Sequence, residues 1–181
     1  MSWSPAVLPP SRQPIRWVRC VRSWKICAGK SNPSRKCSRI FSGVGGNARQ
    51  VFYRSPNLTM LKVCFPNGRR TPPHDHGTWA TILLLSGEEK NTLYRRENGR
   101  LSRVSEVTLT RGEILPMLAE TVHVAECLGD KPSIGLHVYG GDIMGEVPRH
   151  MWDPQTLAEH ALDWNTYETF AQAASQAPSA P

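Results

Sequence analysis

Two histidines stand one residue apart at the start of an apolar run in segment 68–87, GRRTPPHDHGTWATILLLSG. Side chains two positions apart on an extended strand project from the same face, so the imidazoles of His74 and His76 would point the same way. A third imidazole is available from His123, in the later segment VHVAEC. Neutral imidazoles are good ligands for iron, copper, zinc and nickel. The three histidines therefore predict a metal site. Residue 80 would lie on the same face of the strand as His74 and His76, but it is alanine, so it supplies no carboxylate.

Short strands separated by turn residues must position these histidines. The Asn98-Gly99 pair is a hairpin signal, because both turn positions accept positive φ. The expected strands cover residues 58–65, 80–85, 91–96, 102–110, 113–118, 122–127 and 133–139. Strands at this spacing, with no helical pattern between them, predict an all-β antiparallel sandwich or small barrel.

One short amphipathic helix is expected after the strands, over residues 164–177. Asn165 is the predicted N-cap, with Glu168 three residues later at the spacing of a capping box. Tyr167, Phe170 and Ala171 fall on one side, so we expect this helix to pack on the barrel and to have no other role. The chain then divides into a leader (1–46), a barrel (47–148) and a C-terminal extension (149–181).

Charge is distributed unevenly along the chain. Residues 1–74 contain 14 Lys or Arg and no acid, whereas residues 75–181 contain 8 Lys or Arg and all 15 acids. The net charge of +7 therefore belongs to the leading segment, and we expect no nucleic-acid partner. Residues 1–46 are rich in Pro, Ser, Arg and Trp, which favours a poorly ordered leader. A transit peptide and a wrongly assigned start of translation are the alternatives.

Cysteine usage and hydropathy bear on the compartment. The five cysteines are odd in number, show no C-x-x-C spacing and follow no apolar signal core. This pattern favours free thiols in a reducing compartment. No stretch approaches the ~20 apolar residues that span a bilayer. We therefore expect a soluble, cytoplasmic monomer with no membrane partner.

The spacing of these residues resembles the two sequence signatures of the cupin superfamily. Gly68, His74, His76 and Gly87 fit the first signature, which departs only at Ala80, where the family usually has Glu. The second signature fits in the spacing of Gly112 and His123. Its usual inner Pro, Gly and Asn are replaced here by Leu118, Glu120 and Cys127. The resemblance implies a cupin double-stranded β-helix.

A narrower resemblance is carried by PPHDHGTWATILLLSGEEKNTLYRR together with PSIGLHVYGGD. Over about residues 47–153 the chain resembles the thiol dioxygenases, the cysteine dioxygenase group. The resemblance implies Fe(II) held by His74, His76 and His123. It also implies a reaction in which both atoms of O2 are added to the sulfur of a small thiol, cysteine or a related mercapto acid, giving a sulfinic acid. The alternatives are another metal-dependent cupin enzyme and a non-catalytic cupin that binds a small ligand.

Further site residues follow from the same resemblance. His137 and Tyr139 match the His and Tyr that line the substrate pocket of those enzymes, and Arg49 resembles the Arg that pairs with the substrate carboxylate. The family's Ser two residues before this His is replaced by Gly135, which puts the hydrogen-bonded relay in doubt. The strand 133–139 carries small and polar residues on one face and Ile, Leu and Val on the other. If the small and polar face looks inward, it leaves room for a ligand.

Overall fold

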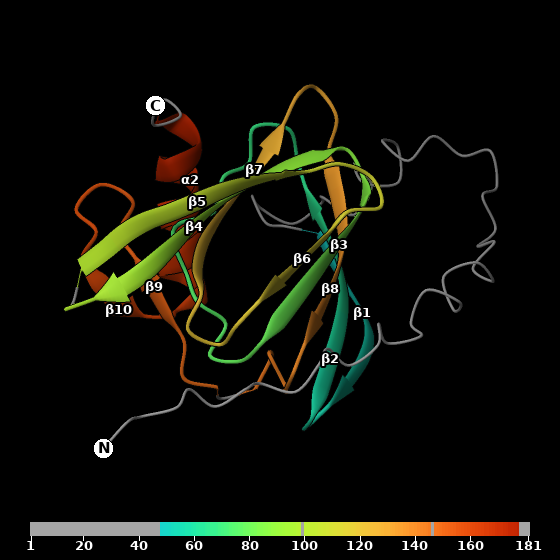
Figure 1. The fold of residues 1–181 in the computed structure, drawn as a ribbon, viewed down its shortest axis with the longest axis horizontal. Helices are drawn as coiled ribbons and strands as arrows, with labels where there is room; N and C mark the ends of the chain where they lie inside the picture. The colour runs from blue at the N-terminus through green and yellow to red at the C-terminus, as the bar shows by residue number, and fades with distance from the viewer. Residues whose placement is uncertain (1–47, 99, 146, 178–181) are drawn as a thin grey trace, which may run out of the picture. The chain divides into compact units, whose positions relative to one another are not determined.

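Ten strands and one helix form the part of the chain that the computed structural model describes, residues 48–98, 100–145 and 147–177 (Figure 1). The leader predicted over 1–46 lies outside the described residues. The strands are β1 (Ala48–Ser55), β2 (Leu58–Phe65), β3 (Ala80–Ser86), β4 (Glu88–Glu97), β5 (Arg100–Leu109), β6 (Ile114–Met117), β7 (Val122–Leu128), β8 (Ser133–Tyr139), β9 (His150–Trp152) and β10 (Glu159–Ala161). The helix, α2, spans Trp164–Gln176.

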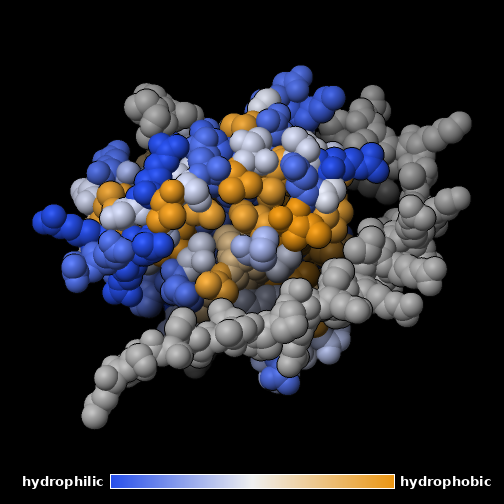
Figure 2. All heavy atoms as spheres, in the orientation of Figure 1, coloured by the Kyte–Doolittle hydropathy of each residue, from blue (hydrophilic) through white to orange (hydrophobic). Residues whose placement is uncertain are grey.

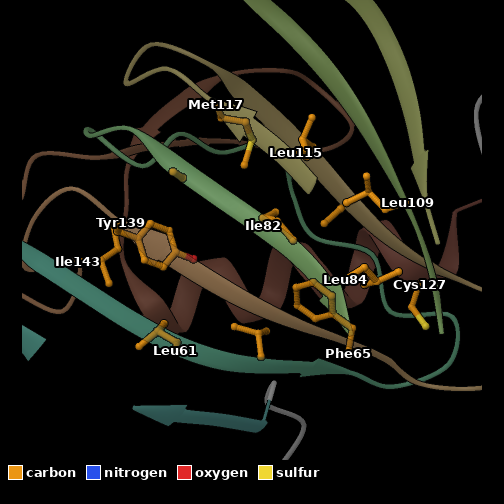
Figure 3. Close-up of a cluster of buried hydrophobic side chains, with 13 residues drawn as sticks. Leu61, Phe65, Ile82, Leu84, Leu109, Leu115, Met117, Cys127, Tyr139 and Ile143 are labelled. Carbon is orange, nitrogen blue, oxygen red and sulfur yellow. The ribbon is translucent and has the colours of Figure 1, made fainter. Parts of the chain in front are cut away.

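The strands form antiparallel sheets that share one core. One sheet has the order β1-β2-β8-β3-β6, and a second has the order β5-β4-β7. The short pair β10-β9 is connected to the second sheet through segment 70–74, which forms isolated bridges with both β7 and β9. The central apolar cluster takes Leu61 and Ile82 from the first sheet and Leu109 and Cys127 from the second (Figure 3). The two sheets therefore pack face to face around this cluster.

Strand β8 shows why the fold leaves a cavity. Its side chains alternate strictly between buried and half-buried positions, and the buried face carries Ser133, Gly135, His137 and Tyr139. The half-buried face carries Ile134, Leu136 and Val138. Because a strand sends alternate side chains to opposite faces, the small and polar set looks into the interior. The interior face of β8 is thus the one that leaves room for a ligand.

All seven predicted strands are present, as β2 to β8, with ends displaced by up to three residues. β1 was not predicted, and three consecutive apolar residues at its centre, 51–53, are all largely exposed on an edge strand. β9 and β10 were also missed, since three residues are too few to show a period. Large apolar side chains are also exposed elsewhere, including Val104, Ile114 and Leu118. Figure 2 shows hydrophobic residues gathered in the middle of one face, among hydrophilic ones.

The start of α2 differs from the prediction. Asp163, not Asn165, is the N-cap, because its side-chain Oδ1 accepts a hydrogen bond of 2.9 Å from the backbone N–H of Thr166. Glu168 does not close a capping box; its carboxylate instead accepts from the buried guanidinium of Arg69 at 2.6 Å. This ion pair attaches α2 to the segment that leads into the two neighbouring histidines.

Two cysteines lie among the described residues. Cys127 is a buried free thiol, whereas Cys64 is disulfide-bonded, so the prediction of free thiols is wrong for Cys64. Among the described residues, no helix combines the length and the apolar character that crossing a membrane requires.

Candidate metal centre

The three imidazoles predicted as metal ligands converge in the interior. His74 and His123 face each other across an antiparallel bridge and exchange two backbone hydrogen bonds, of 3.0 and 2.9 Å. His76 follows two residues after His74, and the ring centroids of the three lie 4.6 to 5.2 Å apart. One ring nitrogen from each lies within 4.8 Å of the other two, and all three side chains are buried. This group could hold a metal ion.

Hydrogen bonds at Nδ1 orient two of the three rings. Nδ1 of His74 lies 3.0 Å from the carbonyl oxygen of Pro72, and Nδ1 of His123 lies 2.9 Å from Oδ1 of Asn91. Both partners are acceptors, so each Nδ1 carries the proton and each Nε2 keeps its lone pair. Nε2 of His123 is buried and has no hydrogen-bond partner within the described chain. An acceptor at Nδ1 is the support that metal-ligating histidines normally have.

Burial keeps these imidazoles neutral. It lowers the pKa of His74 to about 4 and holds the pKa of His76 and His123 well below the usual range. Repulsion between the neighbouring rings adds to this effect for His76 and His123. A neutral ring with a free lone pair is the form that binds a metal, so the site fits a divalent first-row cation.

The acidic residue between two of the ligands does not enter the site. Asp75 accepts a hydrogen bond of 2.9 Å from the backbone N–H of His150, and its other oxygen lies 3.0 Å from Nδ1 of the same residue. The carboxylate thus anchors the HDH segment to β9. The side chain of His150 is 38% exposed.

His137 and Tyr139 lie beside the three imidazoles. Nδ1 of His137 is 3.1 Å from the hydroxyl of Tyr139, whose ring centroid is 5.1 Å from that of His76. Burial lowers the pKa of His137 to about 3 and raises the pKa of Tyr139 well above its usual value. Nε2 of His137 is buried and makes no hydrogen bond to a described residue.

Gly135 explains the position of this ring. A Cβ at Gly135 would lie 2.9 Å from Nε2 and 3.1 Å from Cδ2 of His137, so the ring occupies space that a larger residue would claim. Ser133, the serine on the same face of β8, donates to Glu89 at 3.1 Å instead of to His137. The hydrogen-bonded chain on β8 therefore has two members, His137 and Tyr139.

A cavity of about 190 Å³ opens beside these residues, and two arginines line it. The guanidinium of Arg49, on β1, lies 4.2 Å from the ring centroid of Trp164, and that of Arg149 lies 5.3 Å from the same ring. Neither arginine forms an ion pair with a described residue, and the described residues of the lining include no Asp or Glu. Nε of Arg149 is buried without a partner in the described chain. The cavity is therefore positively charged.

The structure thus brings together every predicted site residue: the three histidines, His137, Tyr139 and Arg49 all line the cavity. It adds Arg149 and two aromatic residues of α2, Trp164 and Tyr167, which the sequence did not indicate. The ring of Tyr167 contacts that of His74 edge to face at 5.3 Å, so α2 closes the cavity as well as packing on the sheets. An aromatic residue on the apolar face of a helix carries no signal that separates these two roles.

Comparison with known proteins does not assign the chain to a family. No family model matches the sequence. Similar solved structures include an RmlC-like cupin with a double-stranded β-helix fold from Methanocaldococcus jannaschii (12% identity, TM-score 0.45, covering 57% of this chain and 87% of that chain). A protein with a double-stranded β-helix domain from Klebsiella pneumoniae subsp. pneumoniae has 18% identity and a TM-score of 0.44, covering 70% of this chain and 94% of that chain. The DMSP lyase DddQ from Ruegeria pomeroyi has 20% identity and a TM-score of 0.48, covering 60% of this chain and 53% of that chain.

These identities and TM-scores are too low to indicate a ligand or a reaction. The chain's own antiparallel strand order, with two sheets packed on one core, is the predicted all-β double-stranded β-helix with a short C-terminal helix. The molecule is a cupin-fold protein that carries three buried histidines able to hold a metal ion.

Proposed function

We propose that this protein is an Fe(II)-dependent thiol dioxygenase acting on a small mercapto acid. The observation that carries the proposal is the combination of three neutral imidazoles, free of any carboxylate ligand, with a small positively charged cavity. The reaction is RSH + O2 → RSO2H, in which sulfur loses the four electrons that reduce O2, so no further reductant is needed. His74, His76 and His123 would hold the iron. When bound, it would supply the Lewis acidity that lowers the thiol pKa and the redox chemistry toward O2.

The size of the cavity supports a small substrate. Its volume of about 190 Å³ lies below the range of about 300 to 1,000 Å³ that is usual for drug-sized ligands. A thiol of a few carbon atoms is the class that such a space admits.

The charge of the cavity supports an acidic substrate. Arg49 and Arg149 are both free to pair with a carboxylate, which a guanidinium binds through two parallel hydrogen bonds. An ammonium group would find no carboxylate partner among the described lining residues. We therefore expect a mercapto acid to bind more tightly than cysteamine, with cysteine between them because it carries both groups.

His137 and Tyr139 would supply a hydrogen bond without adding charge. With the proton of His137 on Nδ1, that nitrogen donates to the oxygen of Tyr139, at 3.1 Å. The phenol proton is then free to point into the cavity, where it can stabilise charge that develops on the reacting group. The high pKa of Tyr139 keeps the phenol protonated at neutral pH.

A second candidate is a metal-binding cupin that holds a small anion without turnover. Gly135 and the unpartnered Nε2 of His137 favour this candidate. The hydrogen-bonded pair on β8 lacks the serine hydroxyl that completes the relay in the dioxygenases that the sequence resembles. The cytoplasmic location and the monomeric state remain predictions.

Anaerobic loading with Fe(II), followed by exposure to O2 with a panel of small thiols, tests the proposal. We expect O2 uptake and sulfinate formation in a 1:1 ratio with 3-mercaptopropionate or cysteine, and much slower uptake with cysteamine. Full iron occupancy without O2 uptake for any thiol would reject the dioxygenase and favour the binding protein. Uptake that depends on a carbon substrate would indicate another cupin enzyme.

Matched variants connect the activity to the site. His123→Ala should abolish iron binding, whereas His160→Ala, at an exposed position outside the cavity, should not change it. Arg149→Ala should raise the KM for a mercapto acid and leave that for cysteamine unchanged, because only the acid offers a carboxylate to the lost guanidinium.

A further inference from the structure

A buried carboxyl group on β4 is connected to one of the three imidazoles through a single amide. Glu89 is 1% exposed, and its Oε1 accepts a hydrogen bond of 3.1 Å from the side-chain amino group of Asn91. Its Oε2 accepts one of 3.1 Å from the hydroxyl of Ser133. On its other side, Oδ1 of Asn91 lies 2.9 Å from Nδ1 of His123. None of the candidate catalytic steps uses Glu89.

Burying a carboxyl group costs free energy unless hydrogen bonds compensate for the water that it loses. Burial raises the pKa of Glu89, while the hydrogen bonds from Asn91 and Ser133 oppose that rise. Leucine or valine could fill a position on the inner face of a strand without this cost. The residue therefore contributes something that an apolar side chain would not.

The direction of the hydrogen bonds shows what that contribution is. Oε1 of Glu89 accepts the hydrogen bond between these two side chains, so Asn91 turns its amino group toward Glu89. The carbonyl oxygen of Asn91 then has to face His123. A ring nitrogen that faces a carbonyl oxygen must carry the proton, which leaves the lone pair on Nε2, the buried atom with no partner in the described chain.

We propose that Glu89 is a positioning residue that fixes the tautomer of His123 through Asn91, and so keeps Nε2 available to a metal cation. Without the carboxylate, the amide of Asn91 can turn over and present its amino group to His123. Nδ1 would then have to accept, Nε2 would carry the proton, and the ring could not bind a metal. This inference rests on the metal site of the proposed function and not on its substrate or its reaction.

The first test measures the tautomer in the metal-free, full-length protein by long-range ¹H–¹⁵N correlation NMR. His123 should be protonated at Nδ1 in the wild type. In Glu89→Met, which keeps an unbranched side chain of similar length, the Nε2-protonated form should appear. The affinity for Zn²⁺, measured by competition with a chelator, should fall by about 10- to 100-fold, the usual effect of losing support behind a metal ligand.

Two further variants separate tautomer control from packing. Ser133→Ala removes a donor to Glu89 but leaves the Asn91 pair intact, so tautomer and affinity should stay as in the wild type. The exchange Glu89→Gln with Asn91→Asp reverses the hydrogen bond between the two side chains, because the Gln amino group now donates to Asp. It still leaves an acceptor facing Nδ1 of His123. This double variant should retain Nδ1 protonation and should not lose Zn²⁺ affinity.

Each outcome is decisive. Nε2 protonation of His123 in the wild type would overturn the inference directly, and so would unchanged tautomer and affinity in a folded Glu89→Met protein. If Glu89→Met does not fold, the exchanged pair decides, since loss of Nδ1 protonation there contradicts the inference. Wild-type protein that binds metal but oxidises no thiol would reject the proposed function and leave this inference standing.

Discussion

Replacing Gly135 by alanine tests the close packing between β8 and the ring of His137. Gly→Ala at a strand position without positive φ normally stabilises by about 0.4 to 1 kcal/mol, because it restricts the unfolded chain. Here the added Cβ would lie 2.9 Å from Nε2 of His137 and 3.5 Å from Cγ2 of Ile82. The ring cannot move away freely, since its Nδ1 is bonded to Tyr139. Overpacking of this kind costs about 1 to 3 kcal/mol.

The expected net effect is a loss of about 1 to 2 kcal/mol, which lowers the melting temperature by about 2 to 8 °C for a chain of this size. Urea denaturation of the metal-free protein measures it. In a His137→Ala background the obstacle is gone, so the same Gly135→Ala change should become stabilising. Stabilisation in the wild-type background, or the same effect in both backgrounds, would refute the reasoning.

Three further predictions concern the acid response and the attachment of α2. Acidifying the metal-free protein from pH 6.5 toward pH 4 should destabilise it. Burial holds the pKa of His74 near 4 and that of His137 near 3, so the unfolded chain binds protons that the folded one does not. Each such proton lowers the free energy of unfolding by about 1.4 kcal/mol per pH unit. A free energy of unfolding in urea that does not change with pH would contradict this. Asp163→Ala should lower the melting temperature, followed by far-UV circular dichroism, by roughly 2 to 4 °C, whereas Asn165→Ala should change it much less, because only Asp163 caps α2. Glu168→Leu should cost about 1 to 3 kcal/mol, because it removes a charged partner from a buried guanidinium, and should speed hydrogen exchange in α2; unaltered exchange would show that the ion pair does not hold the helix.

Periodicity predicted the strands and much of the site. Alternation along 133–139 separates a small, polar face from an apolar one, and H-x-H spacing places His74 and His76 on one side. Both are local properties of extended chain, which is why they can be deduced before the fold is known. The meeting of His123 with the other two depends on strand order, which no local pattern contains. The sequence offered His123 only as an available third imidazole, and spacing that resembles a known family supported its assignment.

The residues that were missed are those whose role depends on tertiary placement. Arg149 lies outside the strands, where no period marks it. Trp164 and Tyr167 show only the apolar side of a helix, and a side that packs against a sheet looks the same as one that closes a cavity. Asp163 and Asn165 are both good N-caps, so composition cannot decide between them. The hydrogen bond to Thr166 does.

The paired backbone hydrogen bonds between His74 and His123 have a consequence for the order of assembly. In zinc fingers the cation must be present before the chain folds, because nothing else gathers the ligands. Here main-chain pairing has already brought two of the donors together, so a cation would arrive as the last component and not as the nucleus. Occupancy would then follow the supply of free metal in the cell, and each tenfold increase above the dissociation constant would add about 1.4 kcal/mol to the free energy of unfolding.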